Sequence, residues 1–216
     1  MTGILNILLF LLFQVVDPTS PKGSDPEKVN IKNLPDWTAA LSAHNDGLSD
    51  VALLKLEEIN SRQDLSDENR TRIRALLVEN LVRTGQYEEA LSTAKGDEFP
   101  FWRGMALSGL GRLTEALPIL YQFIDDPSDT RHENALITIS SAYDSIGMAD
   151  KSIQIISDSL EKSKESPRSP IIYLILADLH ITKGNYDESL KSLNKATISP
   201  KSRFKLLAEI IRSRNL

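Results

Sequence analysis

The stretch "KGNYDESLKSLNKATISP", residues 183–200, decides the fold of this protein. After Gly184 it carries an aromatic residue, then small and apolar residues at helical spacing, and finally a proline: Tyr186, Ser189, Leu193, Ala196 and Pro200. Glycine suits a tight turn between two helices because it adopts left-handed backbone angles without a steric penalty. Small side chains let neighbouring helices approach closely, and proline stops a helix. The stretch therefore predicts a turn followed by a closely packed helix that ends before Pro200.

The same pattern recurs upstream. Four segments align on their glycines: "TGQYEEAL" at Gly85, "LGRLTEAL" at Gly111, "IGMADKSI" at Gly147 and "KGNYDESL" at Gly184. The residue five positions after each glycine is always small: Ala90, Ala116, Ser152 and Ser189. The glycines are 26, 36 and 37 residues apart, so the first interval predicts short helices on either side of residues 97–100. A degenerate fifth copy places Trp37, Leu41 and His44 before Gly47.

The whole segment from Asp36 onwards has helical periodicity. Apolar residues return every three or four positions, and strand-like alternation is absent from the sequence. Aromatic residues make up only 6% of the chain, while the straight-chain residues that favour helices are plentiful. One hairpin is too small to bury its own apolar face, so stacking of similar hairpins is the natural arrangement. An irregular helical bundle with glycine turns remains the alternative.

On these residues the chain resembles the tetratricopeptide repeat family, whose units are about 34 residues long. The last copy fits best: Tyr173, Leu176 and Ala177 precede the turn, and His180 replaces a tyrosine of the family pattern. The resemblance covers about residues 36–200 and implies an all-α fold, an α-solenoid of about five antiparallel helical hairpins. His180 is then expected to be a core histidine with its hydrogen bonds satisfied.

The two ends of the chain differ from the repeats. Residues 4–16, "ILNILLFLLFQVV", are almost entirely apolar, and residues 17–35 form a Pro- and Ser-rich linker. Residues 1–16 are therefore expected to be an export signal or a short membrane anchor. Residues 1–3 contain no Lys or Arg and no clean cleavage site follows, so a cleaved signal and an uncleaved anchor both stay open, with a helix buried in the domain as the further alternative. Residues 201–216 are expected to form an amphipathic, basic capping helix.

Composition and spacing argue against several classes of function. The net charge is −5, but residues 201–216 carry +4, which leaves −9 for residues 1–200 and disfavours nucleic-acid binding. Cysteine is absent, and the three histidines, His44, His132 and His180, are far apart. No spacing assembles a metal site or a nucleophile with its base. The protein is therefore expected to be no enzyme and to bind neither metal nor cofactor.

The resemblance also implies where a partner would bind. In tetratricopeptide proteins the first helix of each hairpin lines a concave groove, which points to positions three, six, ten and thirteen residues before each turn glycine. The candidate groove residues are Arg72, Glu79, Phe101, Met105, Asn134, Ile137, Ser141, Leu174 and Asp178. Several of them could instead pack between hairpins.

The function expected from the sequence is a non-catalytic scaffold that binds a protein partner in this groove. It is expected to be exported, or tethered at the cell envelope with possible membrane association through residues 4–16. The alternative is a structural subunit that packs laterally in a larger membrane-associated complex, without a free groove.

Overall fold

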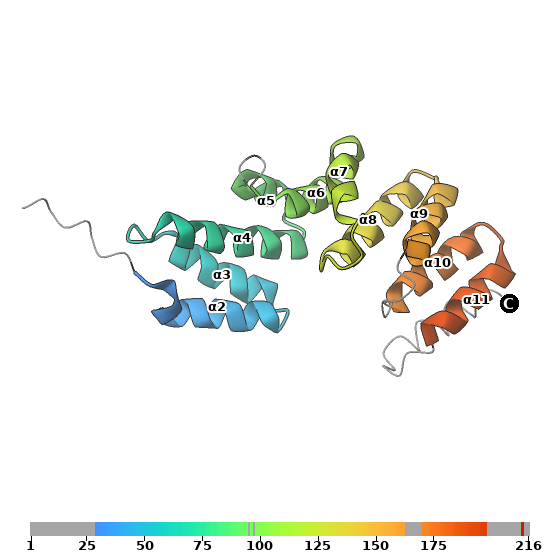
Figure 1. The fold of residues 1–216 in the computed structure, drawn as a ribbon. Helices are drawn as coiled ribbons and strands as arrows, with labels where there is room; N and C mark the ends of the chain where they lie inside the picture. The colour runs from blue at the N-terminus through green and yellow to red at the C-terminus, as the bar shows by residue number, and fades with distance from the viewer. Residues whose placement is uncertain (1–28, 95, 97, 163–169, 198–212, 214–216) are drawn as a thin grey trace, which may run out of the picture.

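The computed structural model describes residues 29–94, 96, 98–162, 170–197 and 213 (Figure 1). Among these residues the secondary structure is helical and contains no strand. Within the described parts of residues 29–162 and 170–197, ten α-helices form five antiparallel hairpins: α2 (Pro35–Asn45) with α3 (Ser49–Asn60), α4 (Asp67–Arg83) with α5 (Tyr87–Ala94), α6 (Pro100–Gly109) with α7 (Leu113–Leu120), α8 (His132–Ser145) with α9 (Ala149–Lys162), and α10 (Pro170–Thr182) with α11 (Tyr186–Thr197). Two 3-10 helices, η1 (Ile31–Asn33) and η2 (Tyr121–Phe123), precede the first hairpin and follow the third. The predicted all-α solenoid of five hairpins is confirmed.

Each hairpin turns at its glycine in the same way. The five turn glycines have φ between 72° and 78°. At the last turn the Gly184 amide donates to the Ile181 carbonyl at 2.8 Å, and the Asn185 amide donates to the His180 carbonyl at 2.8 Å. This pair of bonds satisfies carbonyls that the end of a helix would otherwise leave unpaired. The four other turns repeat it, which explains why glycine marks every repeat.

Replacing Gly111 by alanine should lower the free energy of unfolding by about 1–2 kcal/mol, because φ at this residue is +72° and a Cβ atom disfavours that backbone conformation. A Cβ built at Gly111 has no neighbour within 4 Å, so the effect comes from the backbone alone. Urea unfolding measures it, with Gln154→Ala on the exposed side of α9 as the control. Equal midpoints for the two variants would contradict this account of the turn.

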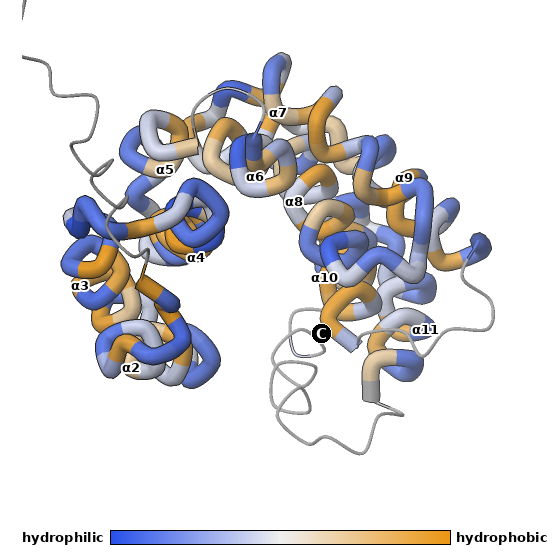
Figure 2. Tube along the Cα trace, turned by 60° about the vertical axis from the view of Figure 1, so that its left-hand side comes forward, coloured by the Kyte–Doolittle hydropathy of each residue, from blue (hydrophilic) through white to orange (hydrophobic). Residues whose placement is uncertain are grey.

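The five hairpins follow one another along an open arc (Figure 2). The first helices α4, α6, α8 and α10 contact one another in sequence and lie on the inner side of the arc, and α5, α7 and α9 lie on the outer side. The small residues predicted for close helix packing are all fully buried: Ala90, Ala116, Ser152 and Ser189. Where serine replaces alanine its hydroxyl has a partner, because Ser152 Oγ donates to the Ser140 carbonyl at 3.0 Å. A polar atom is therefore tolerated in this tight contact.

The middle of the array departs from a regular repeat, as the short glycine interval predicted. Helices α5 and α6, which flank the predicted break, have eight and ten residues, and α7 has eight. Pro118 lies inside α7, and the chain continues directly into η2, which carries the buried Phe123. This extra turn adds an aromatic side chain to the core beside α6.

The folded part begins earlier than predicted. The sequence placed residues 17–35 in a linker, but the Val29 amide donates to the Asp64 carbonyl at 3.1 Å, and Ile31 is only 1% exposed. An isoleucine at this point is buried because it covers apolar surface of the first hairpin, together with Leu34 and Trp37. Residues 1–16, the rest of the linker to residue 28, and the expected capping helix of residues 201–216, apart from Ser213, lie outside the described residues.

Candidate functional site

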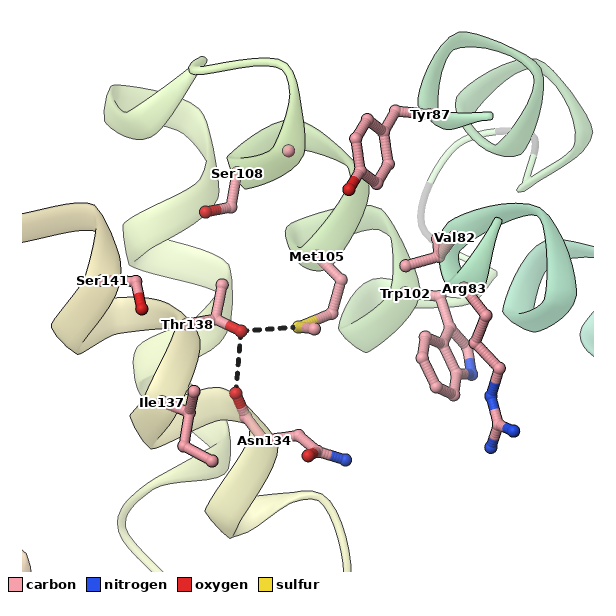
Figure 3. Close-up of a pocket in the computed structure, with 11 residues that line it drawn as sticks. Val82, Arg83, Tyr87, Trp102, Met105, Ser108, Asn134, Ile137, Thr138 and Ser141 are labelled. Carbon is pink, nitrogen blue, oxygen red and sulfur yellow. Dashed lines mark hydrogen bonds between the residues drawn. The ribbon is translucent and has the colours of Figure 1, made fainter. Parts of the chain in front are cut away.

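A cavity of about 490 Å³ opens on the inner side of the arc, between the second, third and fourth hairpins (Figure 3). Helices α4, α5, α6 and α8 all contribute to it. Its lining residues are Val82, Arg83, Tyr87, Trp102, Met105, Ser108, Gly109, Asn134, Ile137, Thr138 and Ser141. The volume lies within the range of pockets that hold small ligands or a few side chains of a partner.

The centre of the cavity is apolar. Trp102 and Met105 on α6 face Ile137 on α8, and all three side chains are half-buried. Thr138 Oγ1 donates to the Asn134 carbonyl at 2.8 Å and lies 3.2 Å from Met105 Sδ, as the dashed lines in Figure 3 show. The contact between Thr138 and Met105 links α8 to α6. The methionine and the indole offer a polarizable surface that adapts to different apolar side chains.

Polar groups surround this apolar centre. The side chains of Ser108, Asn134 and Ser141 and the indole N–H of Trp102 make no hydrogen bond to any other described residue. The side-chain amide of Asn134 has two N–H donors and an oxygen acceptor, and each serine hydroxyl can both donate and accept a hydrogen bond. Groups of this kind can pair with the amides and carbonyls of an extended peptide, while an apolar side chain of that peptide fills the centre.

Tyr87 forms one wall of the cavity. It begins α5, and its ring lies against α6 at Gly109, where a Cβ atom would overlap the ring. Glycine at residue 109 is thus needed for the close approach of the tyrosine to the next hairpin. Tyr186 is the equivalent residue of the last hairpin, since it also lies two residues after the turn glycine. Its side chain is 51% exposed.

Arg83 contributes a charge to the cavity wall, and this charge is already paired. Its guanidinium contacts Glu79 Oε1 at 2.6 Å, and the same carboxylate lies 3.7 Å from His44 Nε2. The lining is therefore close to neutral. It offers hydrogen bonds and apolar contact to a ligand, without a strong preference for an acidic or a basic partner.

The structure brings four of the nine predicted groove residues together in this cavity, namely Met105, Asn134, Ile137 and Ser141. Three others lie outside its lining. Arg72 is exposed on α4 and pairs with Glu68 at 2.6 Å, Glu79 pairs with Arg83, and Asp178 is exposed on α10.

The last two predicted residues, Phe101 and Leu174, belong to the core, which corrects their assignment to a groove. Phe101 is 3% exposed and packs edge-to-face on Trp102 and Phe123, with ring centroids 4.8 and 5.2 Å apart. Leu174 is 2% exposed and packs in a cluster with Leu193. The aromatic ring of Phe123 explains the first case, since η2 supplies a partner that a regular repeat lacks.

Sequence reasoning missed Trp102 and Thr138, which both lie nine residues before their turn glycines. The expected register was ten residues before the glycine. With Phe101 turned into the core, the next residue of α6 faces the cavity, and Trp102, Met105 and Ser108 follow one another at intervals of three. This spacing was visible in the sequence, but the side of α6 that faces the cavity is fixed by tertiary contacts, among them the contact of Phe101 with Phe123.

His180 differs from its expected state. It is half-buried on α10, as expected, but its Nδ1 atom is buried without a hydrogen-bond partner. Burial lowers the pKa of this imidazole, and the nearby carboxylate of Glu188 opposes the shift. The described residues contain no cluster of three or more potential ligands that could hold a metal ion, and none of their helices is both long and apolar enough to span a membrane.

A second cavity, of about 370 Å³, lies beside the start of α4 and is lined by Asn60, Asp67, Arg70, Thr71 and Arg74. Its two arginines are engaged in structural contacts. Arg74 pairs with Glu98 at 2.7 Å, and Arg70 donates to the Arg62 carbonyl at 2.9 Å. We therefore take the inner cavity as the candidate functional site.

Stacked hairpins with an inner cavity define an α-solenoid built from helical repeats. A family model described as tetratricopeptide repeat matches residues 171–197, which span α10 from its second residue and the whole of α11. The curated proteins contain no match to this chain.

Solved structures extend the likeness to the whole array. A thermophilic TPR protein of Thermus thermophilus superposes with a TM-score of 0.61 and 19% identity, over 86% of this chain and 98% of that one. A structure of MamA superposes with a TM-score of 0.51 and 18% identity, over 81% of this chain and 96% of that one. A MamA structure labelled MSR-1 superposes with a TM-score of 0.51 and 16% identity, over 77% of this chain and 95% of that one. The array as a whole therefore has the fold of a tetratricopeptide-repeat solenoid, and its last hairpin also matches the family in sequence.

Proposed function

We propose that this protein is a non-catalytic scaffold that holds an extended segment of a partner protein in the inner cavity, and that residues 4–16 tether it to a membrane. The observation that carries the first part is the cavity itself. Three successive hairpins converge there on an apolar centre with unpaired polar groups around it. Such a surface recognises a peptide by its backbone and by one apolar side chain.

The tether rests on the composition of residues 4–16, which contain only two polar residues, Asn6 and Gln14. A run of thirteen mostly apolar residues has the length of the hydrophobic region of an export signal, or of a short anchor inserted in the membrane interface. The scaffold would then present its groove near a membrane, at the cell envelope.

Photo-crosslinking from the cavity tests the scaffold. A crosslinker placed at Ser141 should capture a partner in cells, and the same crosslinker at Gln154, on the outer side of α9, should not. Met105→Glu combined with Ile137→Glu should weaken binding of that partner by at least about tenfold, because a loss of about 1.4 kcal/mol already has this effect. Both side chains are half-buried, so thermal unfolding must confirm that the variant remains folded.

Gln154→Glu serves as the matched control, since it adds a carboxylate to an exposed position away from the cavity. Capture of the same partner from both positions, or unchanged affinity in the folded double variant, would reject the cavity as the binding site.

A further inference from the structure

Helix α3 carries an apolar stripe on its outer surface. Leu48, Val51 and Leu54 are 55%, 49% and 65% exposed. They lie one, four and seven residues after the turn glycine Gly47, and therefore close to one another along one side of α3. The buried side of the same helix is formed by other residues: Ala52, Leu53, Leu56 and Ile59.

The other four hairpins show that this stripe is no requirement of the fold. The residues one, four and seven positions after their turn glycines are all exposed, and all but two are polar: Gln86, Glu89 and Ser92; Arg112, Glu115 and Pro118; Met148, Lys151 and Gln154; Asn185, Glu188 and Lys191. These positions face solvent in every hairpin. Only in the first hairpin of the described array do three large aliphatic side chains occupy them.

The stripe is small for a protein interface. Three side chains exposed by half to two-thirds offer on the order of a few hundred Å² of apolar surface, whereas a stable complex buries roughly 800 Å² on each partner. A second copy of this chain would therefore not be held by the stripe alone. Whatever binds the stripe must therefore also be held to this protein by a second contact.

Residues 4–16 supply such a contact. Val29, the first described residue, is held beside the first hairpin through its bond to Asp64, and the 12 residues from 17 to 28 span at most about 40 Å. Helix α3 is about 18 Å long. Whatever surface binds residues 4–16 therefore also lies close to the stripe on α3.

The composition of residues 4–16 indicates which surface binds them. If they packed on α3, their opposite side would remain apolar and exposed to water, because Asn6 and Gln14 cannot form a polar face. A lipid bilayer covers such a segment on all sides. We propose that α3 lies on the bilayer that holds residues 4–16, with Leu48, Val51 and Leu54 inserted at its interface. This inference rests on the proposed tether.

The charges beside the stripe indicate which lipids it prefers. Asp50, Glu57 and Glu58 are exposed on α3, and the nearby Lys55 is paired with Asp36 at 2.9 Å and with Glu58 at 3.2 Å. This side of the hairpin is therefore acidic. Zwitterionic lipid suits it better than anionic lipid, whose surface potential repels carboxylates.

The contact also orients the scaffold. The stripe lies on a second helix of a hairpin, while the cavity is lined mainly by the first helices α4, α6 and α8 on the inner side of the arc. Membrane contact and partner binding thus use different surfaces, and both can occur together.

The chain contains no cysteine, so a single labelled cysteine reports one position. Val51→Cys and Glu89→Cys, in the full chain, place an environment-sensitive fluorophore at equivalent positions of the first and second hairpins. With phosphatidylcholine vesicles, the label at residue 51 should shift to the blue and be quenched several-fold more by lipid-attached nitroxide than the label at residue 89. Adding phosphatidylglycerol should reduce both effects.

Leu48→Glu with Leu54→Glu should abolish the shift at residue 51 while the chain still sediments with vesicles. Sedimentation with an unshifted label at residue 51 would overturn the α3 contact alone, and no sedimentation of the unmodified chain would overturn the tether and this inference together. A blue shift that depends on protein concentration without vesicles would show that a second copy covers the stripe.

Discussion

Phe101→Ala should lower the free energy of unfolding by about 3–5 kcal/mol, the usual effect of removing a buried phenylalanine side chain. Phe101 is 3% exposed and contacts two other aromatic rings, those of Trp102 and Phe123. Its removal leaves a cavity at the junction of α6 with η2, where helices of only eight to ten residues give the array few alternative contacts. Urea unfolding followed by circular dichroism measures the change.

Met105→Ala is the matched control, because Met105 lies one turn further along α6 and is only half-buried at the inner cavity. Met105→Ala should lower the free energy of unfolding by less than half as much as Phe101→Ala does, and should instead weaken partner binding. Phe101→Ala should leave partner affinity unchanged at temperatures where the protein is folded. The reverse pattern would mean that Phe101 faces the groove, as the regular repeat register predicted.

Asn80→Ala should lower the free energy of unfolding by about 1–3 kcal/mol, because it breaks a buried polar link between the first two hairpins. Asn80 is fully buried. Its Nδ2 atom donates to the Leu76 carbonyl at 2.7 Å and lies 3.1 Å from His44 Nδ1 on α2. Alanine would remove these bonds and leave His44 Nδ1 without its partner on α4.

Hydrogen exchange distinguishes this link from ordinary packing. In Asn80→Ala, amides of α2 and α3 should exchange faster than those of α8 to α11, since the stability of a repeat array depends on contacts between neighbours. Asn45→Ala, which removes an exposed amide at the end of α2, is the control and should change neither stability nor exchange appreciably. A uniform increase along the whole array would show that Asn80 does not specifically couple the two hairpins.

The repeat architecture could be predicted because its signals are local. The turn needs a glycine with positive φ, and the close packing of the two helices needs a small residue five positions later, as Gly184 and Ser189 show. The start of the folded part was predicted too late, at Asp36, because Ile31 looks like part of a Pro-rich linker until the surface that it covers is known.

The candidate site was predicted only in part, for a related reason. Met105 and Ile137 keep the regular register and line the cavity, while Phe101 does not. Phe101 instead packs in the core against Phe123, which lies twenty-two residues further along the chain in a 3-10 turn. The polar link between Asn80 and His44 was equally invisible, since it joins residues 36 positions apart that share no pattern.

The sequence by itself determined that this chain folds into glycine-turned helical hairpins, because the spacing of glycine, small and apolar residues acts within each hairpin. Only the tertiary structure decided which residues face the inner cavity and which outer surface stays apolar. Those outcomes depend on how far each helix rotates when it packs against its neighbours, and that rotation is set by contacts such as Phe101 with Phe123 that link different parts of the chain.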